Sequence, residues 1–336
     1  MGASGAIPPR SMRPSAASMA HPAQVVGGRV LEQPLPRARF LETLPRAAYT
    51  AALVRDGRFV REWPLHVQRL SLSLASLHPH LPAPGYSAHL QRVAPEAPDG
   101  EAALDLLEGS LRGPIGACLS AYRSGAAEVP SLSMLVVALE PPPRESSSAF
   151  EVHAHVAPAP ARHPRREACL LGAPRAVPVA KDSSWILARR GLEAQRPGDA
   201  EVLLSNADGG ILEGLTTNFF VVERGAAAVL TLRTAAPSQG VAWGTGRERV
   251  LRAARSLGWR VVEDAPLGAD ANAWVEAFVG NAVDPVQPLE RVWCSEDNIW
   301  GLGPWARELP GVDGELLAPL RDEVAREMTW TDASMW

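Results

Sequence analysis

The sequence has 336 residues, of which 46% are hydrophobic and 21% are charged, and its 33 basic and 37 acidic residues leave a net charge of -4. A chain of this length and apolar content is expected to fold as a globular protein of two domains. The charge balance leaves no basic face for nucleic acid, and no apolar run approaches the roughly 20 residues that span a bilayer. We therefore expect neither nucleic-acid binding nor a membrane span.

Cysteine and histidine give no sign of a metal site or of a disulfide framework. The three cysteines, Cys118, Cys169 and Cys294, form no CxxC pair, which favours a reducing, intracellular compartment. The two HxH pairs at 78–80 and 153–155 have no third ligand at a metal-site spacing. We expect no metal.

The first 32 residues are predicted to be disordered or to form a transit segment. Residues 1–31 contain no Asp or Glu and three arginines, a composition typical of organellar targeting peptides. Prolines at positions 8, 9 and 14 interrupt any amphipathic helix there. The compartment is accordingly cytoplasmic, or a plastid or mitochondrion if the segment targets the chain.

Residues 33–158 are predicted to form a small N-terminal α+β domain. A helix from about residue 64 would bury one face that carries Leu70, Leu74 and Leu77. A Pro/Arg-rich linker at 157–166 would follow the last strand. The other predicted elements are strands at 49–54, 132–139 and 150–156, a turn at 56–57, and helices at 101–112 and 115–123.

Residues 159–336 are predicted to form a larger C-terminal domain. Short strands at close spacing in its middle part suggest a curled sheet. The predicted helices are 182–194, 246–257 and 315–328, and the predicted strands are 201–205, 211–213, 218–223, 228–233, 259–263 and 275–280.

Lys181 is the only lysine in the chain, whereas 32 of the 33 basic residues are arginine. Arginine can replace lysine as a surface charge, but it stays protonated and cannot add to a carbonyl as a neutral amine. A single retained lysine is therefore a candidate for Schiff-base chemistry. A coding bias that replaced lysine nearly everywhere explains the same composition equally well.

Two further segments suggest binding chemistry. Glu213 interrupts the apolar run LEGLTTNFFVV, and a buried carboxylate needs a partner such as a protonated heterocyclic nitrogen; an exposed turn carboxylate is the alternative. Gly244, Thr245 and Gly246 precede a predicted helix, whose exposed N–H groups would bind an anion such as phosphate. Arg69 could supply a charge for that phosphate.

Five segments occur in the order typical of one enzyme family: HVQR with Arg69, AKDSSW with Lys181, EGLTTNFF with Glu213, GVAWGTGR at 240–247, and NAVDPVQP at 281–288. Over roughly residues 45–310 the chain thus resembles the class IV (fold-type IV) family of pyridoxal-phosphate (PLP) enzymes. This family contains D-amino acid aminotransferases, branched-chain aminotransferases and aminodeoxychorismate lyases. The resemblance implies an α+β fold of two domains with PLP in a cleft between them, and a homodimer.

The resemblance also implies roles for individual residues. Lys181 would form the Schiff base and shuttle the proton, Glu213 would pair with the pyridine N–H, and Arg69 would bind the phosphate together with the backbone at Thr245 and Gly246. The remaining cofactor-binding positions are Asn218, Asn281 and Ala282, and the positions expected to border the substrate are Tyr49, Thr50 and Trp185. Arg175 or Arg189 could bind a substrate carboxylate.

The predicted function is transamination between an amino acid and a 2-oxo acid through a quinonoid carbanion. The first alternative is an aminodeoxychorismate lyase, which reaches the same carbanion and then eliminates pyruvate to give p-aminobenzoate. The second is a non-catalytic PLP-binding homologue, because Ile186 stands where branched-chain enzymes place a tyrosine that contacts the cofactor. The requirement for a 2-oxo acid acceptor distinguishes the aminotransferase from the lyase.

Overall fold

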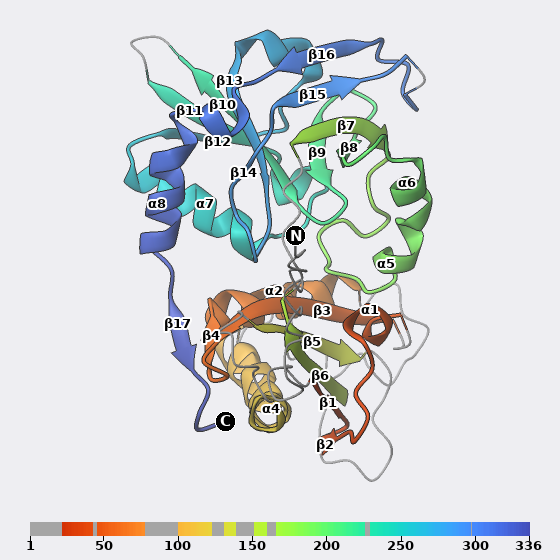
Figure 1. The fold of residues 1–336 in the computed structure, drawn as a ribbon, viewed down its shortest axis with the longest axis vertical. Helices are drawn as coiled ribbons and strands as arrows, with labels where there is room; N and C mark the ends of the chain where they lie inside the picture. Colours follow the sequence, from red (N-terminus) through yellow and green to blue (C-terminus); the bar gives the residue numbers. More distant parts are fainter. Residues whose placement is uncertain are drawn as a thin grey trace, which may run out of the picture.

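The computed structural model describes residues 22–42, 46–77, 100–122, 131–138, 151–159, 166–225, 229–296 and 298–336. These residues form two β-sheets with helices packed against them, one sheet in the lower half of Figure 1 and one in the upper half. Helices and strands are both abundant and the sheets are mostly antiparallel, which confirms the predicted α+β fold.

The first sheet has the strand order β17-β4-β3-β5-β6-β1-β2, and all its neighbours are antiparallel. Helices α2 (Trp63–Leu77) and α4 (Gly100–Ala121) cover one face of it, while the short helix α1 (Arg37–Phe40) lies near β6. Its strands are β1 (Ala23–Val26), β2 (Arg29–Val30), β3 (Ala47–Arg55), β4 (Phe59–Arg61), β5 (Ser131–Ala138), β6 (Glu151–Pro158) and β17 (Trp330–Asp332).

The predicted disordered or transit segment 1–32 is too long at its C-terminal end. Residues 23–30 form β1 and β2, and β1 pairs with β6 along its whole length. Ala23 and Val25 are buried in the core beneath α4 because alternate residues of this strand face the sheet interior. Residues 1–21 lie outside the described residues, so the transit segment stays a prediction.

The two helices predicted at 101–112 and 115–123 are a single helix, α4, that continues through Pro114. Buried Leu107 and Leu111 precede the proline, and buried Ile115 and Cys118 follow it at helical spacing. A proline removes one backbone hydrogen bond from a helix interior. Here the continuous apolar face against the sheet offsets that loss.

The second sheet has ten strands in the order β12-β11-β10-β9-β8-β7-β15-β16, with β13 paired to β10 and β14 paired to β13. It is mixed: β7 runs parallel to β8 and β15, and β11 runs parallel to β12. The strands are β7 (Glu167–Gly172), β8 (Glu201–Ser205), β9 (Ile211–Gly214), β10 (Asn218–Arg224), β11 (Leu230–Thr234), β12 (Arg260–Glu263), β13 (Trp274–Gly280), β14 (Gln287–Pro288), β15 (Arg291–Cys294) and β16 (Trp305–Glu308).

Strand β10 lies at the centre of this sheet and is buried on both faces. Phe219 packs edge-on against Trp274 on one face, and Phe220 stacks on Phe278 on the other. The second face is covered by α7 (Thr245–Ser256) and α8 (Leu317–Arg326). Short 3-10 helices lie at Pro237–Gln239, Gly268–Ala273 and Gly311–Asp313.

The helix predicted at 182–194 is two short helices, α5 (Trp185–Ala188) and α6 (Arg190–Gln195), which begin later. Asp182 does not join a helix because it forms an extended bridge with Ala48 and an ion pair with Arg46. Arg189 separates the two helices. Tertiary contacts with β3 therefore override the helical pattern at the start of this segment.

Two segments join the second sheet to the first, one after strand β7 and one after helix α8. The segment after β7 crosses to β3, where the Tyr49 N–H donates to the Lys181 carbonyl and the Ser183 N–H donates to the Ala47 carbonyl. At the C-terminus the chain returns from α8 to the first sheet, where β17 pairs with β4 (Figure 1). The domain boundaries stay a prediction, although this last strand of the 159–336 range lies in the first sheet.

Among the described residues, no helix combines the length and the apolar character that crossing a membrane requires.

Candidate active site

Lys181 lies where the two sheets meet. Its backbone N–H donates to Ser73 Oγ on α2 at 3.0 Å, and its carbonyl accepts from the Tyr49 N–H at 2.9 Å. Its Nζ lies 5.2 Å from the centre of the Tyr49 ring. Elements from both halves of the chain thus fix the backbone on either side of this amine.

Burial lowers the pKa of the Lys181 amine, and the charges of Arg69, Arg175 and Arg189 lower it further, against an opposing effect of Tyr49. Burial would raise the pKa of Tyr49, but the charges of Lys181, Arg189 and Arg175 outweigh it, so the pKa of this phenol is lowered. More of the amine is therefore neutral at a given pH than in a free lysine, which is what a nucleophilic amine needs.

Glu213 is a buried carboxylate on β9 with a donor at each oxygen. Its Oε1 accepts from Arg175 Nε at 2.7 Å, and its Oε2 accepts from the Ala242 N–H at 3.1 Å. Both side chains of the ion pair are about 95% buried, with 6% of Arg175 and 5% of Glu213 exposed. The sequence predicts a partner for a buried carboxylate at this position, and within the chain that partner is Arg175.

Arg175 links Glu213 to the lysine segment. Besides the carboxylate, its guanidinium donates to the carbonyl of Ala180 at 3.1 Å and to the carbonyl of Pro178. The sequence offered Arg175 only as a substrate-carboxylate ligand, but this structure commits it to Glu213. Its pairing depends on contacts across 38 residues of sequence, and no local pattern could have revealed it.

Gly244 and Gly246 stand on either side of the first residue of α7 and pack too closely on their neighbours to carry a side chain; residues 244–246 are called the cradle below. A Cβ on Gly244 would collide with the Asn218 side chain, and a Cβ on Gly246 would collide with the Asn281 carbonyl. Thr245, the first residue of α7, has a buried Oγ1 with no hydrogen-bond partner among the described residues. An orphaned hydroxyl at a helix N-terminus fits an anion there, because the first N–H groups of a helix also lack partners.

Arg69 extends from α2 toward the residues just before α7. Its buried guanidinium donates through Nε to the Trp243 carbonyl at 2.9 Å, two residues before Thr245. Burial lowers the pKa of Arg69 to about 10, a value at which the group is still a cation at neutral pH. The charge expected to bind phosphate therefore lies beside the open helix end.

Asn218, Asn281 and Ala282 frame the cradle rather than open into it. Asn218 Nδ2 donates to the Ala242 carbonyl at 3.4 Å, and Asn281 Oδ1 accepts from the backbone N–H groups at 283 and 284 at 2.9 Å. The Ala282 carbonyl accepts from Arg61. In this structure the two asparagines hold the shape of the two loops that pack on Gly244 and Gly246.

The three residues expected to border the substrate have different surroundings in the structure. Tyr49 lies beside Lys181, but Thr50 points to the opposite face of β3, where its hydroxyl is 2.6 Å from Nδ1 of buried His66. Thr50 therefore does not join the site, because neighbouring residues of a strand point to opposite faces. Trp185 donates through Nε1 to the Leu215 carbonyl at 2.8 Å and packs 5.8 Å from Arg175, so it supports the loop after Glu213.

Two further predicted positions have partners of their own. Arg189 forms an ion pair with Glu193 at 2.9 Å, while its charge also lowers the pKa of Lys181 and of Tyr49. Ile186 packs with Tyr49, Leu53 and Val283 in a small apolar cluster, where the branched-chain enzymes would have a tyrosine. The site therefore has an apolar wall at this position.

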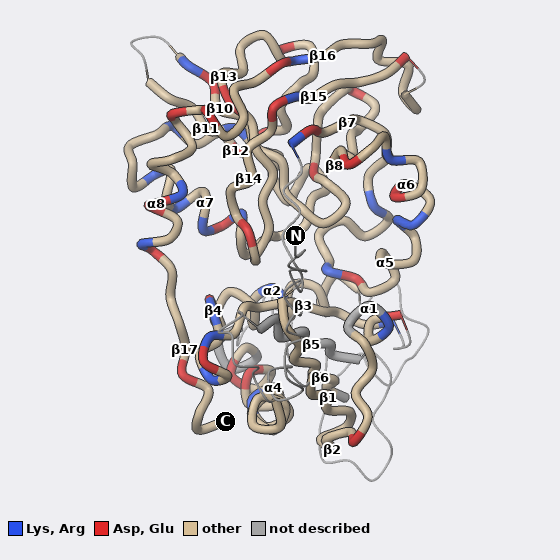
Figure 2. Tube along the Cα trace, viewed as in Figure 1, with Lys and Arg blue, Asp and Glu red and all other residues tan. Residues whose placement is uncertain are grey.

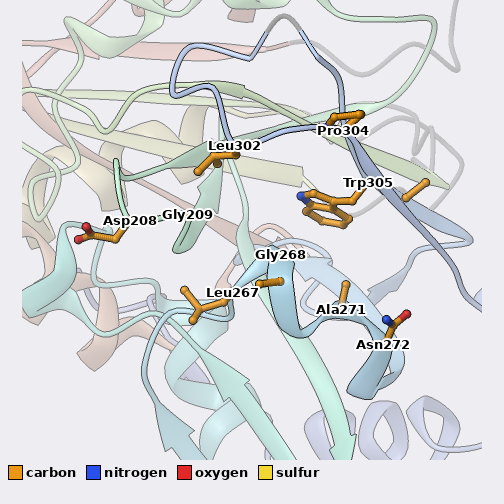
Figure 3. Close-up of a pocket in the computed structure, with 11 residues that line it drawn as sticks. Asp208, Gly209, Leu267, Gly268, Ala271, Asn272, Leu302, Pro304 and Trp305 are labelled. Carbon is orange, nitrogen blue, oxygen red and sulfur yellow. The ribbon is translucent and has the colours of Figure 1, made fainter.

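A separate pocket of about 500 Å³ lies in the second sheet's outer part (Figure 3). In Figure 3 the Trp305 ring lies next to Gly268, so close that a Cβ on this glycine would collide with the ring. None of the residues predicted from the sequence lines it; its lining consists of Asp208, Gly209, Leu267, Gly268, Ala269, Ala271, Asn272, Leu302, Pro304, Trp305 and Ala306. Over the described part of the chain, no group of three His, Cys, Asp or Glu side chains could hold a metal.

Residues 47–292 match the family model of the class IV aminotransferases, so the chain belongs to this family. A structural comparison found a hypothetical aminotransferase from Mycobacterium tuberculosis in a PLP-bound form, with a TM-score of 0.60, 21% identity, and coverage of 91% of this chain and 98% of that chain.

Two other solved structures share the fold. The fold IV-transaminase CpuTA1 from Curtobacterium pusillum gives a TM-score of 0.59 at 19% identity, covering 91% of this chain and 98% of that one. The branched-chain amino acid aminotransferase from Escherichia coli gives 0.55 at 16% identity, covering 89% and 92%. Comparison with curated protein sequences gave no match. The fold is thus that of the fold-type IV aminotransferases, as the resemblance implied.

Pyridoxal 5'-phosphate is the cofactor of this family, and the residues present fit it. The orphaned Thr245 hydroxyl and the glycine cradle suit its phosphate, with Arg69 alongside. The buried carboxylate of Glu213 suits a protonated ring nitrogen, and the Lys181 amine suits its aldehyde. A suitable partner for each polar part of the cofactor therefore occurs around one junction.

Proposed function

We propose that the protein is an aminotransferase that exchanges the amino group of an amino acid with a 2-oxo acid at Lys181. PLP supplies an aldehyde that reacts with amines and a ring that withdraws electrons from the carbon beside the amine. The observation that carries the proposal is the convergence of a lysine of lowered pKa, a buried carboxylate and an open helix N-terminus at one junction.

Each protein group has one task in this proposal. Lys181 Nζ holds the cofactor and then moves a proton to and from the substrate carbon. Tyr49, beside the amine, keeps a polar group near that proton, and its own lowered pKa makes it able to give one up. Glu213 accepts the ring N–H, and Arg175 together with the Ala242 N–H keeps its carboxylate in place.

The phosphate end is proposed to bind at the start of α7. Thr245 and Gly246 present N–H groups there, and Thr245 adds a hydroxyl that has no partner in the described part of the chain. Arg69 balances the phosphate charge. Binding at this end fixes the ring relative to Lys181, so the proton moves between atoms held in position.

The first test uses the single lysine of the chain. Borohydride reduction of the protein with PLP should attach a pyridoxyl group that mass spectrometry locates on Lys181, because the only other primary amine is the N-terminus. Lys181→Arg, which keeps the charge, should remove the label and the visible absorbance band. Equal labelling of Lys181→Arg would contradict the proposed role.

The second test separates the alternatives. Amino acids should convert the absorbance band to that of the aminated cofactor, and a 2-oxo acid should restore it. Release of pyruvate from aminodeoxychorismate without any 2-oxo acid would instead identify the lyase. A band that no L- or D-amino acid perturbs, together with no pyruvate release, would indicate the non-catalytic homologue.

The resemblance to the family also suggests a homodimer. Light scattering of the same sample tests this proposed homodimer.

A further inference from the structure

Glu62 is a buried acidic residue in an unusual backbone conformation. It lies between β4 and α2 with φ of 50°, and among the described residues only Asp56 is another non-glycine with positive φ. Asp56 is exposed in a turn, whereas Glu62 is 4% exposed. Non-glycine residues rarely adopt such a conformation, and it persists where the surroundings hold it in place. The contacts that hold Glu62 therefore indicate what it is for.

The Glu62 carboxylate joins three segments. Oε1 accepts from the Thr329 N–H at 3.2 Å, and Oε2 accepts from Arg252 Nη2 at 3.4 Å. Arg249 Nη1 lies 4.0 Å from Oε1. The backbone is also fixed, since the Glu62 N–H donates to the Thr329 carbonyl and the Glu62 carbonyl accepts from the His66 N–H. One residue of the first sheet thus contacts α7 and the C-terminal segment.

Arg249 depends on this carboxylate. Its side chain is 1% exposed, and neither its Nε nor its Nη1 has a hydrogen-bond partner among the described residues. Burial lowers the pKa of Arg249, and Glu62 is the acidic neighbour that opposes this effect. Arg249 lies one helical turn after Thr245, so a change in its position is passed directly to the start of α7.

Arg61 makes the second connection at the same corner. Its guanidinium donates to the carbonyls of Ala282 and Val283, in the loop whose Asn281 carbonyl packs against Gly246. Figure 2 shows basic and acidic residues on α7 and around β4, on the two sides of this junction. Arg61 therefore contacts the loop at 281–283, while its neighbour Glu62 contacts α7, and the Asn281 carbonyl of that loop packs against Gly246 of α7.

We propose that Glu62 is a positioning residue for the cofactor phosphate, which sets α2 and its Arg69 against the N-terminus of α7 through the ion pairs with Arg249 and Arg252. Glu62 touches no reacting atom. The proposal rests on the proposed function, since the phosphate is that of PLP. Without the carboxylate, the buried Arg249 has no counter-charge, and the two halves of the cradle lose their fixed separation.

The test compares Glu62→Gln with the wild-type protein in binding PLP and binding pyridoxal, which lacks the phosphate. We expect Glu62→Gln to weaken PLP binding about tenfold and to change pyridoxal binding less than about twofold. The matched control is Asp332→Asn, which removes an exposed ion pair with Arg58 at the β4–β17 edge and should leave both affinities unchanged. Glu62→Asp should restore part of the PLP affinity.

Equal weakening of PLP binding and pyridoxal binding would overturn the proposal, because it would indicate general damage to the fold. Unchanged binding of PLP would also overturn it. If Glu62→Gln does not fold, Arg252→Gln replaces it, since Arg252 is 46% exposed and its loss should weaken PLP binding alone by a few-fold. A wild-type protein that binds no PLP would instead defeat the proposed function itself, and the wild-type titration reveals this before any variant is measured.

Discussion

The two ends of the candidate site differ in how completely their buried polar groups are paired. At the Glu213 end, both carboxylate oxygens accept hydrogen bonds and Arg175 supplies the counter-charge. At the α7 end, the Thr245 hydroxyl has no hydrogen-bond partner among the described residues. Buried polar groups are normally paired, so we propose that a ligand binds at the second end, whereas the first end is already paired within the chain.

The largest expected effect is the loss of transamination rate when the Lys181 amine is removed. Lys181→Ala should reduce transamination by roughly 10²- to 10⁴-fold or more, because it removes the amine that moves the proton. Stopped-flow absorbance with an amino acid donor measures the rate, and added methylamine provides a rescue control. Activity within tenfold of wild type would exclude Lys181 as the catalytic amine.

The next prediction concerns the Glu213 end of the site, where the variant removes one partner of the ion pair with Arg175. Glu213→Gln should lower the free energy of unfolding by about 3–5 kcal/mol even without cofactor, since it leaves the Arg175 charge buried and uncompensated. Urea unfolding of the cofactor-free protein measures this. The double variant Arg175→Met, Glu213→Leu should recover part of the loss. If Glu213→Gln unfolds like wild type, the Arg175–Glu213 pair is not a structural unit.

The unpaired end should respond in the opposite way. Thr245→Val removes a hydroxyl that has no partner among the described residues, so the cofactor-free protein should keep its free energy of unfolding or gain up to about 1 kcal/mol. PLP affinity should fall by about tenfold, the value of one hydrogen bond to a charged group. Thr245→Ser is the matched control that keeps the hydroxyl. A destabilised cofactor-free Thr245→Val protein would contradict the comparison.

The smallest effect concerns His66, a third buried polar group, behind β3. Burial lowers the pKa of His66 well below its usual value, and Arg69, Arg61 and Arg249 lower it further. Below about pH 6.5 the unfolded chain binds a proton that the folded protein excludes, so stability is constant above that pH and falls as the pH drops, by at most about 1.4 kcal/mol per pH unit. Below the lowered pKa of His66 in the folded protein, both states bind the proton and stability no longer depends on this group.

His66→Asn should flatten this dependence. Asparagine keeps a polar atom near the Thr50 hydroxyl but does not titrate. Melting temperatures at pH 7.5 and pH 5.5 measure the change in each protein, and their difference should be smaller in His66→Asn than in wild type. Equal differences would show that other groups carry the acid sensitivity.

Sequence reasoning found the residues whose chemistry is rare or whose local pattern is strong. Lys181 stood out as the one lysine, Glu213 as a carboxylate inside an apolar run, and Thr245 and Gly246 as the start of a helix after glycine. The structure places the Lys181 amine, the Glu213 carboxylate and the α7 end at the junction of the two sheets, and their roles remain proposals.

Sequence reasoning could not tell which face of β3 borders the site. Residues 47–50 are all buried, so no alternation of polar and apolar residues separates Tyr49 from Thr50. The predicted helix at 182–194 failed for a related reason. Its first residue is fixed by Ala48 and Arg46, which are more than 130 residues away in sequence.

The sequence by itself determined the family and the α+β fold and predicted which groups bind PLP, because these depend on residue type, order and local periodicity. Only the tertiary structure decided that Arg175 pairs with Glu213, that Thr50 faces His66, and that Glu62 reaches α7. Each of these is a pairing of buried polar groups across long sequence separations. Their energies come from the removal of water around both partners, which no single segment of the chain can specify alone.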